Sequence, residues 1–261
     1  MMTYPIYLKK DGALGWLVLN RPDKRNALTQ AMWRAIPDLV AEAENDPQIK
    51  LLIMRGASSA AFCAGADIAE FTAIAANPER LRQNQTDMSQ AMRALAGMVK
   101  PSLALIQGPC IGGGCGLALA CDLRYADSTA KFAITPSRLG LVYSLFDTRK
   151  LVDAVGPAAA KAMLFTGRVV DAQEARHIGL ADAVCPPEAL EGAVRDMAAA
   201  ICAASQVTVR GAKKIIGKIL AGATDDSGET RAMFRNAFQG PDHAEGVVAF
   251  LEKRKPDFTV S

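Results

Sequence analysis

The stretch C-I-G-G-G-C-G, residues 110–116, places four glycines in seven positions, after the apolar run at residues 101–106 and before L-A-L-A-C. Glycine has no side chain, so such a segment lets another group approach the main chain closely. The pattern predicts a strand, a tight turn and a helix that begins near Gly113. Because the first amides of a helix have no internal acceptor, this turn would offer donors and a positive helix end to a negatively charged oxygen.

Known nucleotide-binding glycine motifs do not fit this stretch. A dinucleotide-binding G-x-G-x-x-G that begins at Gly112 needs glycine where Leu117 stands. A P-loop needs lysine after its last glycine, yet Gly113 is followed by Gly114. The chain also has no G-x-S-x-G motif that would indicate a nucleophilic serine. These three classes of site are therefore not predicted.

A second turn of small residues lies upstream, in F-C-A-G-A-D-I at residues 62–68, again after an apolar run. If each turn supplies one amide, the two donors form an oxyanion hole, in which loss of one donor costs about 3–4 kcal/mol of transition-state stabilisation. One glycine run alone would more simply permit tight packing of a strand on a helix. Two runs together favour a binding site for an oxyanion.

Apolar runs that alternate with helical sequence indicate an α/β fold. A hairpin is expected first, then short buried strands separated by Gly-containing turns and helices, which is typical of a mostly parallel sheet. A helix is expected after Thr29, bent or delayed by Pro37. The polar segment 78–99 is expected to be an exposed helix or a mobile insert. The expected strands are 6–8, 14–19, 50–54 and 101–106.

The last sixty residues are expected to be helical. Apolar residues recur at helical spacing in 189–203 and in 207–220. Such stripes need a partner surface, which is either the chain's own core or a neighbouring subunit. The segment 222–228, G-A-T-D-D-S-G, is typical of a break between helices. We expect a core at 1–203 and a helical region for assembly and site closure at 204–261.

Composition excludes several other classes of function. The 261 residues carry a net charge of +3, and no five like charges are adjacent, which argues against a nucleic-acid surface. No apolar run is long enough to span a membrane, and the N-terminus lacks a signal-peptide pattern. The six cysteines form no C-x-x-C pair and only His177 and His243 accompany them, so we expect reduced thiols, no metal site and a cytoplasmic location.

Four motifs in order resemble those of the enoyl-CoA hydratase/isomerase (crotonase) family. They are N-R-P with N-A-L (20–28), F-C-A-G-A-D-I (62–68), Q-G-P-C-I-G-G-G-C-G-L-A-L-A-C-D (107–122) and F-T-G-R-V-V-D-A-Q-E-A-R-H-I-G-L-A-D-A-V (165–184). The resemblance implies a crotonase-like (ββα superhelix) core with a C-terminal helical oligomerisation region. It further implies a homotrimer or hexamer, and a coenzyme A thioester as substrate with no other cofactor.

The resemblance also implies roles for individual residues. The amides of Ala66 and Gly113 would hold the thioester oxygen. Eight further residues would contact coenzyme A. For Lys24 and Arg25, the alternative is that they are ordinary solvated charges on a loop. The eight are Lys24, Arg25 and Ala27 along the phosphates and adenine, Ala64, Asp67 and Ile68 along the pantetheine, and Phe250 and Lys253 reaching the site of a neighbouring subunit.

The chain departs from the family's hydratases at two positions. By alignment, Gly116 and Pro136 stand where those enzymes carry two glutamates, and neither can act as an acid or a base. The segment T-P-S-R-L-G-L-V-Y (135–143) resembles instead the family's methylmalonyl-CoA decarboxylases, which places Tyr143 at the substrate carboxylate. Those enzymes carry histidine where Ala66 stands, and an ordinary packing role for the tyrosine is the alternative.

Three functions remain open from the sequence. The first is an enoyl-CoA hydratase/isomerase-like enzyme that stabilises a thioester enolate, with Ala66, Gly113 and Tyr143 as its catalytic residues. The second is a decarboxylase of a short carboxyacyl-CoA. The third, of another class, is a protein that binds acyl-CoA without turning it over. Asp147 is the nearest downstream acid, but Ser144-x-x-Asp147 is typical of a helix cap.

Overall fold

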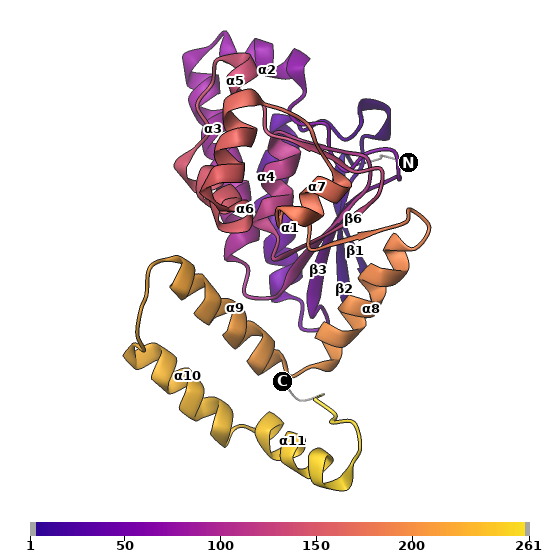
Figure 1. Ribbon diagram of the computed structural model, residues 1–261, viewed down its shortest axis with the longest axis vertical. Coiled ribbons are helices and arrows are strands. Elements are labelled where there is room, and N and C mark those ends of the chain that lie inside the picture. The colour runs from indigo at the N-terminus through magenta and orange to yellow at the C-terminus, as the bar shows by residue number, and fades with distance from the viewer. Residues whose placement is uncertain (1–3, 259–261) are drawn as a thin grey trace.

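The computed structural model describes residues 4–258 and begins with the expected hairpin (Figure 1). Strand β1 (Ile6–Asp11) pairs antiparallel with β2 (Leu14–Leu19), with Ile6 opposite Leu19. The chain reverses at Gly12, whose φ of 58° lies in the left-handed region that favours glycine. The hairpin prediction is confirmed, with β1 longer than expected.

A six-stranded sheet in the order β1-β2-β3-β4-β6-β9 forms the centre of the molecule. Apart from the hairpin, every neighbouring pair in it is parallel. The residues of β3 and β4 are almost all buried, as expected for parallel strands covered on both faces. The parallel strands after β2 are β3 (Leu51–Gly56), β4 (Ser102–Ile106), β6 (Leu123–Asp127) and β9 (Ala183–Cys185).

A smaller sheet lies beside the first, in the order β5-β7-β8. It contains β5 (Pro109–Ile111), β7 (Lys131–Ala133) and β8 (Val170–Asp171). Strand β5 runs parallel to β7, and β8 is antiparallel to it. These strands were not predicted, because two or three residues are too few to show alternation, and their pairing depends on distant segments.

Helices cover both faces of the large sheet. The principal core joins one face to α1 (Gln30–Asn45), α3 (Pro78–Gly97), α4 (Gly113–Ala120) and α6 (Leu145–Thr166). On the other face, α8 (Leu190–Ala203) packs Leu190, Val194 and Ala198 against the strands. As predicted, Thr29 caps α1, accepting a hydrogen bond from the Met32 amide at 3.3 Å, and α1 starts there without delay although Pro37 lies inside it.

The segment 78–99 forms a helix, as one of the two expectations held, but one face of that helix is buried rather than exposed. Helix α3 lies along α1 and buries Asp87, Met92 and Leu95. The Asp87 carboxylate accepts hydrogen bonds from Gln30 Nε2 at 2.9 Å and from Arg34 Nε at 2.8 Å. A buried carboxylate is tolerated because these donors replace water. A helix with a polar sequence can therefore still pack one face against the core.

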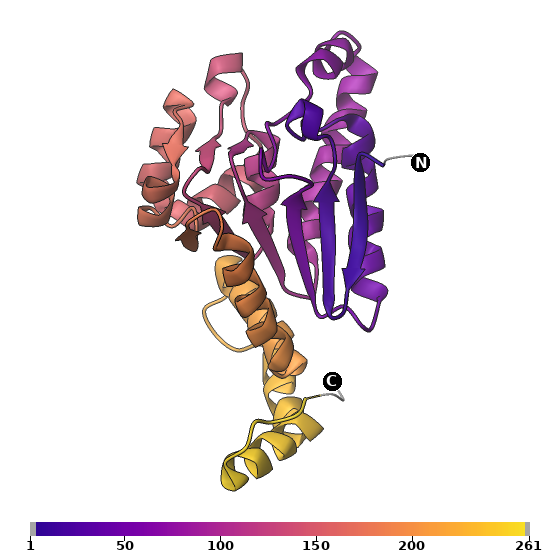
Figure 2. The ribbon, with the colours of Figure 1, turned by 90° about the vertical axis from the view of Figure 1, so that its right-hand side faces the viewer.

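The C-terminal helices extend away from the body as an arm (Figures 1 and 2). The arm consists of α9 (Gln206–Leu220), α10 (Gly228–Gln239) and α11 (Pro241–Glu252), with the predicted break between α9 and α10. Lys213 Nζ fastens α9 to the body through Asp122 Oδ2 at 2.7 Å and the Lys100 carbonyl at 2.9 Å. The helical prediction for this region is confirmed for the described residues.

The remaining short helices connect these layers. They are η1 (Pro22–Lys24), α2 (Ile68–Ala75), α5 (Pro136–Leu139) and α7 (Ala172–His177). Nowhere in residues 4–258 does a helix combine the length and the hydropathy required to cross a bilayer.

Candidate active site

The two glycine-containing turns lie directly against each other. The Cys63 amide donates to the Pro109 carbonyl, and the Ile111 amide donates to the Cys63 carbonyl, both at 2.9 Å. This pair of bonds aligns residues 62–66 with β5 and the turn that follows it. A side-chain atom built on Gly112 would lie 3.9 Å from the Gly65 Cα. The two segments are therefore adjacent along their backbones, as the prediction of a shared site requires.

Ala66 carries a free amide because of how its turn pairs with the N-terminal loop. The Leu28 amide donates to the Gly65 carbonyl at 2.7 Å, and the Asp67 amide donates to the Leu28 carbonyl at 2.9 Å. In such a parallel bridge the residue between the two bonded ones, here Ala66, turns its own amide away from the partner strand. No hydrogen bond within residues 4–258 uses the Ala66 amide.

Gly113 carries the second free amide because it opens α4. The preceding Gly112 has φ 53° and ψ −117°, a conformation that favours glycine, and it offers no side-chain cap. The Gly113 amide likewise donates to no other described residue. Two unpaired main-chain donors from separate turns can bind one oxygen that becomes negatively charged, assisted by the positive end of the helix.

The fit between the turns depends on the absence of a side chain at Gly114. A Cβ there would lie 2.5 Å from the Cys63 Cβ and 2.9 Å from the Cys63 carbonyl oxygen. Cys63 itself is fully buried, and burial raises the pKa of its thiol to about 12. The thiol therefore stays protonated and acts as a packing group between the two turns.

The family model for enoyl-CoA hydratase/isomerase matches residues 9–261. The chain belongs to the enoyl-CoA hydratase/isomerase family. It is 37% identical over 254 residues to crotonyl-CoA hydratase of Syntrophomonas wolfei, covering 97% of each chain. It is 32% identical over 252 residues to short-chain-enoyl-CoA hydratase of Clostridium acetobutylicum, covering 96% of this chain and 95% of that one.

Solved structures agree with this assignment. An enoyl-CoA hydratase/isomerase family protein from Hyphomonas neptunium superposes with a TM-score of 0.96 at 45% identity, over 100% of this chain and 99% of that one. The crotonase-like fold expected from the sequence motifs is thereby confirmed. An acyl-CoA substrate fits this family.

In this member of the family, the loop expected to contact coenzyme A lies beside the first turn. Lys24 and Arg25 are exposed. The Arg25 carbonyl accepts the Ala64 amide at 2.9 Å, and the Ala27 carbonyl accepts Arg21 Nη1 at 2.6 Å. Five of the expected residues are thus brought together: Lys24, Arg25, Ala27, Ala64 and Ala66.

Asp67 and Ile68 begin α2, directly after Ala66. The Asp67 carboxylate accepts Arg21 Nη2 at 2.9 Å and the Glu70 amide at 3.4 Å, so it caps the helix. The Arg21 guanidinium holds the pKa of this carboxyl below its usual range. Ile68 is exposed at the rim of the turn. Sequence analysis missed the bridging role of Arg21, although Arg21 belongs to the N-R-P motif.

Tyr143 approaches α4 from the loop between α5 and α6. Its hydroxyl is buried and has no hydrogen-bond partner within the described residues. Burial raises the pKa of Tyr143 well above its usual range, with smaller contributions from Cys115, Asp147 and Cys110. The hydroxyl is therefore a neutral group with an uncommitted proton and uncommitted lone pairs.

Asp147 serves as part of the cap of α6, as predicted. The Ser144 hydroxyl donates to Asp147 Oδ2 at 2.6 Å and accepts the Asp147 amide at 3.1 Å. Burial raises the pKa of this carboxyl, while the Ser144 hydrogen bond opposes the shift.

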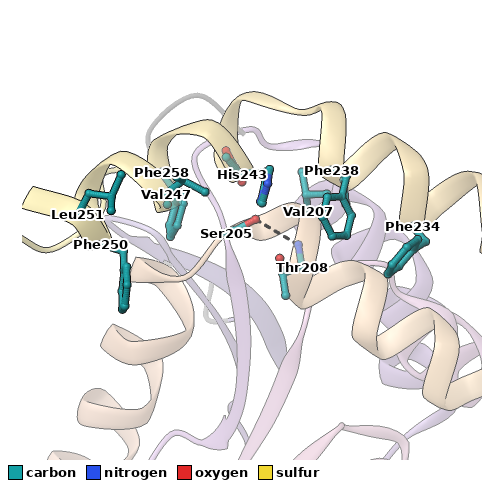
Figure 3. A pocket seen from close by; sticks show the side chains of 13 residues that line it. Ser205, Val207, Thr208, Phe234, Phe238, His243, Val247, Phe250, Leu251 and Phe258 are labelled. Atoms are coloured by element: carbon teal, nitrogen blue, oxygen red, sulfur yellow. Dashed lines mark hydrogen bonds between the residues drawn. The ribbon is translucent and has the colours of Figure 1, made fainter.

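Phe250 and Lys253 are not brought to the two turns of the same chain. They lie at the end of α11, and the arm places them far from α2 and α4 (Figures 1 and 2). Phe250 lies instead beside a hollow of about 640 Å³ between α9, α10 and α11 (Figure 3). Its lining is mainly apolar and includes Val207, Phe234, Phe238, Val247 and Leu251.

Proposed function

We propose that this protein is an enzyme of acyl-CoA thioesters that stabilises an enolate between the amides of Ala66 and Gly113. The supporting observation is that two unpaired amides come from separate turns held together by hydrogen bonds on both sides of Cys63. When the thioester carbonyl becomes an enolate oxygen, preorganised donors stabilise it more than they stabilise the starting carbonyl. Reactions at the α- and β-carbons then become accessible.

In this proposal coenzyme A runs along the N-terminal loop. The exposed cations Lys24 and Arg25 would meet its phosphates, and Ala27 its adenine. Ala64, Asp67 and Ile68 would follow the pantetheine toward the amide pair. The six free thiols of the cysteines support a reducing, cytoplasmic location, which fractionation of the source cells would test.

The most direct test is the carbonyl stretch of a bound thioester. Crotonyl-CoA labelled with ¹³C at its carbonyl, examined by difference infrared spectroscopy, is expected to show a lower stretching frequency when bound than when free. Two donors aimed at the oxygen polarise the C=O bond, so the frequency falls. Binding without such a shift would contradict the proposed role of Ala66 and Gly113.

Hydration by the usual two-carboxylate route is not part of this proposal, because Gly116 and Pro136 occupy the aligned positions. Tyr143 is the nearest candidate for handling a proton. Its buried, unpaired hydroxyl favours a second function, decarboxylation of a short carboxyacyl-CoA such as methylmalonyl-CoA. The bond to the carboxylate carbon would break, its electron pair would pass into the thioester enolate, CO2 would leave, and the α-carbon would then take up a proton.

Product masses distinguish these reactions. The protein would be incubated with crotonyl-CoA, a 3-enoyl-CoA and methylmalonyl-CoA. Gain of water indicates hydration, a new isomer of unchanged mass indicates isomerisation, and loss of CO2 indicates decarboxylation. An inert panel combined with micromolar binding of acyl-CoA would support the non-catalytic binding protein instead.

A further inference from the structure

The place that a side chain at Gly116 would fill is already occupied. A Cβ built on Gly116 would lie 2.6 Å from the Met92 Cε and 3.1 Å from the Tyr143 hydroxyl oxygen. Met92 belongs to α3 and is only 3% exposed, whereas Tyr143 comes from the loop before α6. Two separate segments therefore meet over one bare Cα of α4.

This meeting point lies close to the amide pair. Gly116 follows Gly113 by three residues on α4, which corresponds to about 4.5 Å of rise along the helix. An acyl chain whose carbonyl oxygen binds at Gly113 and that runs along α4 would bring its α- or β-carbon toward the Tyr143 hydroxyl. A buried hydroxyl without a partner is destabilising in the free protein, and a bound acceptor removes that cost.

We propose that Gly116 and Met92 are positioning residues that hold the Tyr143 hydroxyl in place to donate a hydrogen bond to an oxygen carried by the acyl group. This inference rests on the proposed acyl-CoA function. The thioether methyl of Met92 excludes water from one side, and the missing side chain of Gly116 leaves room for the hydroxyl. A neutral donor in these surroundings suits a substrate that brings its own acceptor, such as a carboxylate on the α-carbon.

The arrangement also explains why glycine occupies position 116. A carboxylate side chain there would displace both Met92 and the Tyr143 hydroxyl. A carboxylate at position 116 and the buried Tyr143 hydroxyl therefore cannot occupy this space together. We therefore expect that Gly116→Glu does not create a hydratase.

A double-mutant cycle tests whether Gly116 acts through Tyr143. With whichever acyl-CoA the wild-type enzyme turns over, Gly116→Ala is expected to lower kcat by about tenfold to 100-fold, since small misplacements have large effects on rate. KM should change by less than about twofold. In the Tyr143→Phe background the same Gly116→Ala substitution should change kcat by less than about twofold. If the two substitutions act independently, so that the double variant loses kcat by the product of the two single effects, the inference is wrong.

A rescue variant separates positioning from general damage to the fold. The closest clash at Gly116→Ala involves the flexible end of Met92, so Gly116→Ala/Met92→Ala should regain the part of kcat lost to that clash, but not the part that depends on Met92 itself. Met163→Ala is the matched control, because Met163 is equally buried in the same core but does not adjoin Gly116. If Met163→Ala rescues as well as Met92→Ala does, the inference is wrong.

A titration without substrate keeps this inference separable from the proposed function. Tyrosinate absorbance, compared with and without Tyr143→Phe, reports the ionisation of Tyr143 alone. The titratable groups around it are Cys110 on β5, Cys115 on α4 and Asp147 on α6, with Arg93 of α3 facing Asp147. Met92→Ala should admit water and lower the pKa of Tyr143, whereas Met163→Ala should not.

The outcomes are then distinct. A lowered pKa in Met92→Ala together with an inert substrate panel would support the positioning of Tyr143 and reject the enzymatic proposal. An unchanged pKa in Met92→Ala together with normal turnover would reject the positioning and keep the enzymatic proposal.

Discussion

At the scale of single residues, the guanidinium of Arg21 connects the parts of the site that a substrate would touch. One of its nitrogens bonds the Ala27 carbonyl in the loop at residues 20–28, and another bonds the Asp67 carboxylate next to Ala66. Asn26 works beside it, because its buried side chain accepts the Arg21 amide and donates to the Ala61 carbonyl. The loop and the first turn are therefore one hydrogen-bonded unit.

Replacing Arg21 should loosen that unit. Arg21 is 21% exposed and Asp67 19%, so solvent screens their pair only in part. We expect Arg21→Ala to lower the free energy of unfolding by about 2 kcal/mol and to raise KM for acyl-CoA. Urea denaturation and steady-state kinetics would measure both. Arg149→Ala, which removes an exposed pair with Asp153, is the control and should change stability by less than about 0.5 kcal/mol.

The same pair predicts a dependence of stability on acid. Because Arg21 lowers the pKa of Asp67 below its ordinary value of 3.8, the folded protein keeps this carboxylate ionised where the unfolded chain has begun to bind a proton. Its contribution is complete above the unfolded pKa and is lost as the pH falls through the folded one. Asp67→Asn should therefore lose less stability than the wild type between about pH 5 and pH 3. If the free energy of unfolding falls by the same amount with pH in both proteins, this prediction is wrong.

The sequence predicted the two backbone turns of the site, but it did not predict how the side chains pack around them. The two turns were recognisable because glycines and small residues directly follow apolar strands. The filling of the space above Gly116 by Met92 was not, because an apolar residue in a polar helix carries no signal about which residue it contacts. The position of Phe250 relative to a neighbouring site stays a prediction.

At the scale of elements, the close approach of α4 to the first turn determines the spacing of the two amides. A Cβ on Gly114 would meet the Cβ and the carbonyl of Cys63, neither of which can move without shifting the backbone. We expect Gly114→Ala to destabilise the fold by about 1–3 kcal/mol through overpacking. It should also lower kcat by separating the amides, which steady-state kinetics would detect.

Gly192→Ala is the matched control for that substitution. Gly192 also lies inside a helix, α8, but a Cβ there meets nothing within 4 Å. Alanine is favoured over glycine in a helix, so this variant should gain about 0.5–1 kcal/mol and keep full activity. Equal losses in the two variants would contradict the role assigned to the contact with Cys63, because a Cβ at Gly192 meets nothing within 4 Å.

The elements that sequence predicted were those whose signal is local. The hairpin, the two buried strands at β3 and β4 and the C-terminal helices each show their own periodicity or turn residues. Strands β5, β7, β8 and β9 are two or three residues long and are defined by partners far away in the sequence. Helix α3 was misjudged because its buried carboxylate, Asp87, finds its donors on α1.

At the scale of the whole molecule, the arm leaves apolar side chains in water. Contiguous exposed apolar surface marks an interface, and the trimer or pair of trimers that the sequence resemblance implies would cover it. Light scattering should give a mass several times that of one chain. Lysine at both Ile216 and Ile219 should lower that mass, whereas lysine at exposed Tyr4 should not. The exposed residues are Val207, Ile215, Ile216, Ile219, Leu220, Phe234, Phe238, Val247, Val248, Phe250 and Leu251.

If the arm reaches a neighbour, Phe250 and Lys253 complete a site that belongs to another subunit. Phe250 is 82% exposed, and α11, which carries it, lies far from α4 of its own chain (Figure 1). Phe250→Ala/Lys253→Ala should raise KM for acyl-CoA about tenfold, equivalent to about 1.4 kcal/mol of binding. A mutation in the arm and one in the site would then damage different halves of the same composite centre.

Mixed assemblies test whether each arm completes the site of a neighbouring subunit or the site of its own chain. A chain with Gly114→Ala and a chain with Phe250→Ala/Lys253→Ala, co-expressed with different tags and co-purified, should form assemblies in which an intact arm meets an intact site. Their activity should then exceed the mean of the two parent assemblies, because complementation occurs only between subunits. If each arm serves its own chain, every site keeps one defect, and the activity of the mixture will equal that mean.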